Sequence, residues 1–205
     1  MTGVQTCALP IWAKALYDLL AAPLVASLPQ GATLISINVI APFMVPLKIL
    51  LMAAFMLALP MVLYQAWAFI APGLYTHEKR LVLPLVVAST MLFFAGVAFC
   101  YFFVFGMVFA AIQQFAPASI TAAPDIEAYL SFVLTMFMAF GLTFEVPVVV
   151  VVLVRMGVMS VAQLTSFRGY FIVVAFVIAA IATPPDVVSQ LALALPMCLL
   201  YELGL

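Results

Sequence analysis

Ionisable side chains are scarce in this chain of 205 residues, and one of them stands inside an apolar segment where it could do chemistry. This residue is Glu145, in Gly-Leu-Thr-Phe-Glu-Val-Pro-Val, about ten residues before Arg155. At ~1.5 Å per helical residue the acid lies ~15 Å from the end of its segment, which in a membrane is close to the midplane. A carboxyl there costs roughly 3 kcal/mol or more, so it should face other helices or a partner rather than lipid.

The apolar segments contain no Lys or Arg that could pair with Glu145. The acid is therefore either protonated or hydrogen-bonded by a polar group of another subunit. A functional or partner-binding role is one interpretation of this residue. A purely structural acid, satisfied by a nearby Thr or Ser, is the other.

A second acid, Glu78, lies in the charged run His-Glu-Lys-Arg between two apolar segments. It follows Thr76, a suitable helix N-cap, so it can be read as a first-turn acid favoured by the helix dipole. The functional interpretation is an anion that receives a basic peptide, with Phe69 and Tyr75 as apolar walls. A carboxylate accepts two parallel hydrogen bonds from arginine, so this site suits an arginine-containing ligand.

A polar cluster of Thr183, Asp186, Ser189 and Gln190 lies between the last two apolar segments. Its Pro-Pro-Asp sequence is typical of a turn followed by a helix that Asp186 caps. Gln190, one turn into the last segment, has no such local role. It favours a contact with a neighbouring or partner helix in the membrane.

The sequence gives no support for an enzyme or a cofactor. His77 is the single histidine, and no Ser-His, Asp-Asp, Glu-x-x-His or Gly-rich phosphate motif occurs. Cys7, Cys100 and Cys198 are isolated, so they form neither a disulfide framework nor a metal site and are read as small core residues.

Composition indicates that helices spanning a membrane must position these residues. The chain is 69% hydrophobic and 6% charged, with a mean hydropathy of +1.39, and its apolar runs do not alternate. A net charge of −1 without a basic stripe argues against a nucleic-acid partner. We expect an all-α polytopic membrane protein with five spans, at 48–70, 82–105, 129–154, 169–182 and 187–205.

The distribution of Lys and Arg predicts the orientation of these spans. Loops 71–81 and 155–168 each hold two such residues, whereas 106–128 and 183–186 hold none. The first two loops are therefore predicted to be cytoplasmic, and 13–47, 106–128 and 183–186 to be external. Tyr64, Trp67 and Tyr75 lie where interfacial aromatic residues are expected.

Two further expectations concern the shape and the front of the chain. Pro60, Pro147 and Pro196 lie inside spans and should kink them, which favours a concave bundle. Residues 1–12 are uncharged and too short to span, so we interpret them as a non-native front end. An external 13–47 segment then requires an earlier span that this sequence lacks.

Six motifs in order give the chain a resemblance to a known family, from about Ala13 to Leu205. They are Leu-Pro-Gln-Gly-Ala (28–32), Leu-Tyr-Gln-Ala-Trp-Ala-Phe-Ile-Ala-Pro-Gly-Leu-Tyr (63–75), His-Glu-Lys-Arg (77–80), Asp-Ile-Glu-Ala-Tyr-Leu-Ser-Phe (125–132), Ala-Phe-Gly-Leu-Thr-Phe-Glu-Val-Pro (139–147) and Thr-Pro-Pro-Asp-Val-Val-Ser-Gln (183–190). Together they closely resemble TatC, the polytopic subunit of the twin-arginine, Sec-independent protein translocase. On this reading, 13–205 is a single TatC-like transmembrane domain.

The resemblance implies a function and partners. It implies a receptor in the bacterial inner membrane for the twin-arginine signal peptides of folded cargo, in an oligomeric complex with the single-span subunits TatA and TatB. Transport would be driven by the proton-motive force. The resemblance also implies six spans. The amino-terminal segment and first span of the family, which hold a second acidic residue of the signal-peptide site, have no counterpart in residues 1–12.

The resemblance also implies roles for individual residues. Glu78 and Phe69 match the signal-peptide site, Glu145 matches the membrane-embedded acid, and Pro23 matches a proline of the first external loop. The outer polar site that receives partner helices matches Thr183, Asp186 and Gln190.

Two alternatives of other classes are open at this point. One is a proton-coupled small-molecule transporter that uses Glu145 as its carrier acid. The other is an assembly scaffold whose acids only hold helices together.

Overall fold

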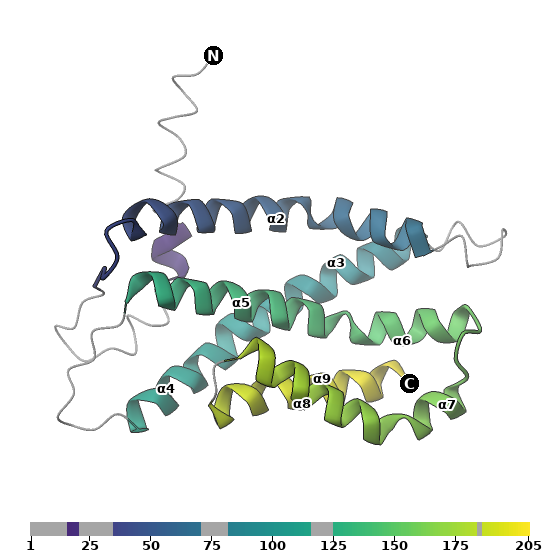
Figure 1. The fold of residues 1–205 in the computed structure, drawn as a ribbon. Helices are drawn as coiled ribbons and strands as arrows, with labels where there is room; N and C mark the ends of the chain where they lie inside the picture. The colour runs from purple at the N-terminus through teal and green to yellow at the C-terminus, as the bar shows by residue number, and fades with distance from the viewer. Residues whose placement is uncertain (1–15, 21–34, 71–81, 116–124, 184–185) are drawn as a thin grey trace, which may run out of the picture. The chain divides into compact units, whose positions relative to one another are not determined.

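The computed structural model describes residues 16–20, 35–70, 82–115, 125–183 and 186–205 (Figure 1). Apart from a short helix at 16–20, its elements are α2 (Ala41–Ile70), α3 (Val82–Phe99), the π-helix η3 (Cys100–Val104), α4 (Phe105–Phe115), α5 (Ile126–Phe144), α6 (Val146–Arg155), α7 (Val161–Ser166), α8 (Arg168–Ala182) and α9 (Val187–Gly204). The described residues contain no strand, only one isolated bridge between Ile35 and Asp125. The predicted all-α fold is confirmed.

Four segments of the described chain are long and apolar enough to cross a membrane, and a fifth apolar helix is shorter. The four are Ala41–Phe69, Leu83–Ala111, Ile126–Arg155 and Val187–Gly204, and the shorter helix is Arg168–Ala182. They overlap the five predicted spans, with different bounds. A multi-pass helical membrane protein follows from this arrangement.

The predicted external loops 13–47 and 106–128 are longer than the structure allows. Residues 41–47 already belong to α2, because Pro42 lies in the first helical turn, where its missing N–H removes no helical hydrogen bond. Residues 106–115 belong to α4 and 126–128 to α5. Gly106 does not end the helix, since its cost of ~1 kcal/mol is offset by the burial of Phe105, Val108 and Phe109.

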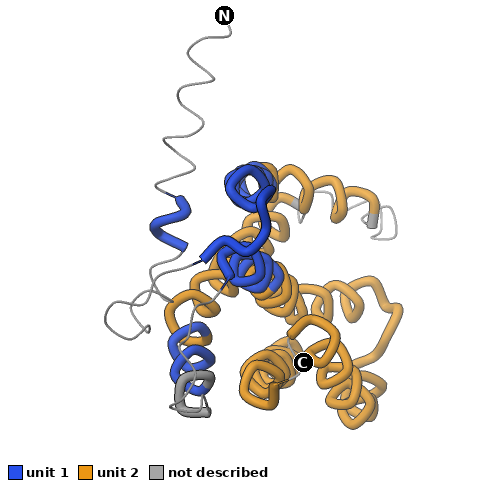
Figure 2. The backbone as a smooth tube through the Cα atoms, turned by 60° about the vertical axis from the view of Figure 1, so that its left-hand side comes forward, with its two compact units in different colours: residues 1–57, 105–135 blue, residues 58–104, 136–205 orange. Residues whose placement is uncertain are grey.

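The chain divides into two compact units, coloured separately in Figure 2. The first comprises 1–57 and 105–135, and the second comprises 58–104 and 136–205. Pro60 lies within α2, which is one continuous helix. The predicted concavity of the bundle stays a prediction, as do the non-native front end and Pro23, which lie outside the described residues.

Aromatic and small side chains form the interior of each unit. In the first unit Phe109 packs against Phe105, Tyr129 and Phe132 with ring centroids 5.7 to 6.2 Å apart. In the second unit α9 packs against both α6 and α8, which lie beside it in Figure 1. The rings of Phe171 and Tyr201 stack there at 4.0 Å.

Candidate functional site

A break between α5 and α6 places Glu145 at a point where regular helical hydrogen bonding is interrupted. α5 ends at Phe144 and α6 begins at Val146, with Pro147 in its first turn. Proline has no N–H to donate to the carbonyl four residues earlier, and its ring crowds that carbonyl, so one continuous helix is disfavoured here. The Glu145 backbone keeps a helical conformation, with φ −75° and ψ −16°. The acid therefore lies at a Pro-induced break inside the span Ile126–Arg155.

The carboxyl of Glu145 is buried, with the residue 7% exposed. Within the described part of the chain, neither of its oxygens has a partner that meets hydrogen-bond geometry. A buried polar group without a partner is costly, so this carboxyl is an unsatisfied position in the fold.

Trp67 lies in the core of the second unit, and its predicted position at the membrane interface stays a prediction. Its ring packs with Val86, Val148 and Val152, and its indole Nε1 donates to the Ser89 Oγ at 3.0 Å. The Trp67 ring can be buried because this bond satisfies its one polar atom. Tyr64 is 48% exposed and keeps a position suited to an interfacial aromatic residue.

The polar residues of the α8–α9 hairpin are tied into local structure. Asp186 is the N-cap of α9, and its Oδ2 accepts a hydrogen bond from the Ser189 N–H at 2.7 Å. The buried Thr183 hydroxyl donates to the Ala179 carbonyl at 2.8 Å. Gln190 Nε2 donates to the Phe176 carbonyl at 3.3 Å, which joins α9 to α8.

One hydroxyl of this hairpin differs from its neighbours. Ser189 is fully buried, and its Oγ has no hydrogen-bond partner among the described residues. The second unit thus holds two buried places with unused hydrogen-bonding capacity, at Glu145 and at Ser189. Sequence reasoning grouped Ser189 with the outer cluster but gave no reason to single it out.

The predicted signal-peptide residues are described only in part. Phe69 lies in the last turn of α2 and is 87% exposed, so its ring is presented outward. Glu78 lies outside the described residues.

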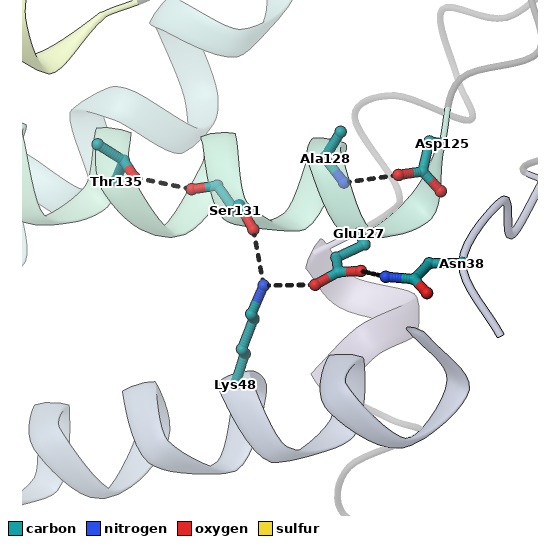
Figure 3. Close-up of polar contacts among 7 residues, drawn as sticks. All are labelled: Asn38, Lys48, Asp125, Glu127, Ala128, Ser131 and Thr135. Atoms are coloured by element: carbon teal, nitrogen blue, oxygen red, sulfur yellow. Dashed lines mark hydrogen bonds and ion pairs between the residues drawn. The ribbon is translucent and has the colours of Figure 1, made fainter. Parts of the chain in front are cut away.

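The structure adds a polar cluster in the first unit that the sequence did not suggest (Figure 3). Lys48 of α2 donates to Glu127 Oε1 at 2.9 Å and to Ser131 Oγ at 3.1 Å, both on α5. Asn38 Nδ2 donates to the other Glu127 oxygen at 3.4 Å. Glu127 therefore joins α5 to α2 and to the segment before α2.

The same segment caps the start of α5. The Ile126 N–H donates to the Ile35 carbonyl at 3.0 Å. The Asp125 carboxylate accepts hydrogen bonds from the N–H groups of Ile37, at 3.3 Å, and Ala128, at 3.2 Å. Lys48 is the first residue of the predicted span 48–70, and a single sequence does not show which acid a lone cation contacts.

The described residues contain no group of three His, Cys, Asp or Glu side chains placed to hold a metal ion. Cys100 and Cys198 are free thiols, with Cys100 buried. Glu145 therefore offers a single buried carboxyl, which can donate, accept or exchange a proton, at the break between α5 and α6. These features define a polytopic α-helical membrane protein with a buried intramembrane acid.

Comparisons with known proteins identify the family. The family model for the Sec-independent protein translocase protein (TatC) matches residues 1–196. The chain is 53% identical over 190 residues to a protein of that name from Halothiobacillus neapolitanus, covering 93% of this chain and 52% of the relative. It is 49% identical over 193 residues to the one from Escherichia coli K12, covering 94% of this chain and 75% of the relative. The chain belongs to the TatC family.

A solved structure agrees with this assignment. The crystal structure described as the twin-arginine translocase receptor TatC is 42% identical to this chain. It superposes with a TM-score of 0.83 over 95% of this chain and 85% of the other. The chain spans about half the length of the Halothiobacillus relative and about three quarters of the E. coli one. None of these relatives is a small-molecule transporter, so the transporter alternative has no support.

Proposed function

We propose that this chain is the signal-peptide receptor subunit of a twin-arginine protein translocase in the bacterial inner membrane. The observation that carries the proposal is the similarity to a solved twin-arginine translocase receptor along 95% of the chain. Loops 71–81 and 155–168 face the cytoplasm, and 106–128 and 183–186 face outward, because Lys and Arg gather in the first pair. The protein does no covalent chemistry in this role.

The arginine pair of the signal peptide binds at the cytoplasmic end of α2. Phe69 supports this placement, since its ring is exposed at the last turn of the helix and can pack on the apolar part of a peptide. Glu78 follows in the predicted cytoplasmic loop and accepts the guanidinium hydrogen bonds. An ammonium group cannot make the same paired contact, so the site should discriminate Arg-Arg from Lys-Lys.

Single-span partner subunits of the TatA and TatB type bind along the membrane face of the chain. Support comes from the Glu145 carboxyl and from the Ser189 hydroxyl near Thr183, Asp186 and Gln190, whose buried oxygen atoms have no hydrogen-bond partner among the described residues. A partner helix that reaches them would satisfy them. A polar side chain in a partner helix is stabilised by a hydrogen bond to such a group, because lipid offers it no hydrogen-bond partner.

Export in cells tests this proposal. Cells that lack their own receptor subunit would receive this chain, with TatA and TatB from the same source, and a cargo carrying an Arg-Arg or Lys-Lys signal. Glu78→Gln should lower export of the Arg-Arg cargo at least tenfold, since a charge-assisted paired contact is lost. Thr76→Ala is the matched control for a purely capping role. Equal losses in the two variants would contradict the proposal.

A further inference from the structure

The turn between α6 and α8, which includes the short helix α7, joins the ends of two apolar membrane segments (Figure 1). The span Ile126–Arg155 ends at Arg155, and the shorter apolar helix begins at Arg168. The ends of membrane spans lie at the level of the lipid headgroups, because the hydrocarbon core sets the length of an apolar segment. Residues 156–167 connect two such ends, so this turn lies in the headgroup region of the bilayer.

The backbone of the turn is held by its own hydrogen bonds. Gly157 has a positive φ of 68°, the conformation that commonly ends a helix, and here it ends α6. Its N–H donates to the Val154 carbonyl at 3.0 Å, and the Val158 N–H donates to the Leu153 carbonyl at 3.1 Å. Ser160 then forms a capping box at the start of α7. The last carbonyls of α6 therefore have backbone donors and need no basic side chain as a cap.

The side chains of this turn form an inner and an outer set. Met156 and Met159 each pack against a buried apolar cluster of the second unit. Arg155, Val158 and Val161 are exposed instead, the two valines at 60% and 47%. The turn thus presents a cation and two apolar side chains outward at the level of the lipid headgroups.

The charge of the turn is not balanced by an acid of the same region. No Asp or Glu occurs between Glu145 and Asp186 in the sequence. Arg168 forms an ion pair with Glu202, with 2.8 Å between Nη2 and Oε2. Arg155 forms no ion pair with any residue that the structure describes. Its guanidinium is therefore available to an anion.

We propose that Arg155, beside Val158 and Val161, binds the headgroup of an anionic phospholipid. The guanidinium donates two parallel hydrogen bonds to the lipid phosphate, and the valines contact the apolar part of the same lipid. The rings of Phe167 and Tyr170 stack at 5.7 Å and are exposed where α8 begins, as interfacial aromatic residues are. The occupant is a lipid rather than a soluble anion, because the cation lies at the end of a span among exposed apolar side chains.

Native mass spectrometry of the chain in detergent micelles measures this binding with added phosphatidylglycerol or phosphatidylcholine of the same acyl chains. The native chain should prefer phosphatidylglycerol, since phosphatidylcholine carries its own cation beside the phosphate. Arg155→Gln should weaken phosphatidylglycerol binding about fivefold, the effect of one cation near an anionic headgroup, and should largely remove the preference. Arg155→Lys should keep most of the preference, because it keeps the charge.

Arg168→Gln is the matched control, since it removes the same charge from an arginine that Glu202 already neutralises. It should keep at least half of the phosphatidylglycerol affinity. Equal losses in the two glutamine variants would overturn the inference by showing a general charge effect. Unchanged affinity in Arg155→Gln, or displacement of the lipid by millimolar inorganic phosphate, would also overturn it. None of these outcomes changes the proposed function, because no signal peptide or partner subunit is present.

Discussion

The buried carboxyl of Glu145 lies at the break between α5 and α6, inside one membrane-spanning segment. Pro147 disfavours a continuous helix at this point. The fold carries the cost of a buried acid that has no hydrogen-bond partner among the described residues. A residue that destabilises the fold locally, without a stabilising contact of its own, is typical of a functional position.

Gly96 permits the close approach of α3 to α5 in the second unit, and its replacement tests this packing. A methyl group at Gly96 would come within 2.6 Å of the Phe140 carbonyl oxygen, a backbone atom that cannot turn away. Gly96→Ala should therefore lower the free energy of unfolding by about 1–3 kcal/mol. Thermal unfolding in detergent measures this change.

Gly106→Ala is the matched control for this prediction. No atom lies within 4 Å of the methyl group that it would add, and Gly106 is helical. Alanine favours a helix over glycine by ~1 kcal/mol, so this variant should be as stable as the natural chain or slightly more stable. Equal destabilisation of both variants would show that α3 and α5 are not in close contact at Gly96.

The sequence predicted single residues well where their type alone is informative. Glu145 stands out because an acid in an apolar segment is rare, and the structure finds it buried. The burial of Trp67 was not predictable, since exposed and buried tryptophans have the same apolar neighbours in sequence and differ in whether the indole finds a partner. The Lys48–Glu127 contact was missed because long-range pairs leave no local pattern.

Helix α9 begins at the N-cap Asp186, and two substitutions there separate the effect of the charge from that of the hydrogen bond. Asp186 Oδ2 accepts from the Ser189 N–H, and asparagine can accept the same bond. Asp186→Ala should lower the free energy of unfolding by about 1 kcal/mol, whereas Asp186→Asn should cost a few tenths. Thermal unfolding of the two variants side by side measures the difference. Equal losses would mean that the side chain does not act as a cap.

The ion pair between Lys48 and Glu127 joins α2 to α5 within the first unit. Its side chains are 37% and 23% exposed, so solvent screens the pair and its coupling should be modest. A double-mutant cycle with Lys48→Gln and Glu127→Gln should give about 0.5–1 kcal/mol, decreasing with added salt. The half-exposed Arg168–Glu202 pair, at 2.8 Å, is the comparison. Zero coupling at low salt would contradict the contact.

Element boundaries were the weakest part of the sequence prediction, for a physical reason. Pro42 and Gly106 are turn signals in water, yet both lie in helices here. Proline fits the first turn of a helix, and packing in an apolar environment outweighs the low helix propensity of glycine. The number of apolar segments was predictable because hydrocarbon thickness sets their minimum length.

The whole molecule combines an apolar set of spans with a few polar positions. The α-helical membrane fold was predicted from composition and the family from six sequence motifs, and both agree with the similarity to TatC proteins. The sequence resemblance names Phe69 and Glu78 as the residues that would contact a signal peptide. Only Phe69 lies within the described residues. Recognition of the arginine pair is therefore the claim that most needs a direct test.

Photocrosslinking from a probe in place of Phe69 tests that claim most directly. The probe would be placed in this chain, and in a chimera that adds the amino-terminal segment of the E. coli relative, both in membranes. Each would meet a signal peptide with Arg-Arg or with Lys-Lys. We predict crosslinks to the Arg-Arg peptide in at least one form and about tenfold fewer to Lys-Lys. Absence of crosslinks in both forms, or equal crosslinking of both peptides, would contradict a twin-arginine receptor site at the end of α2.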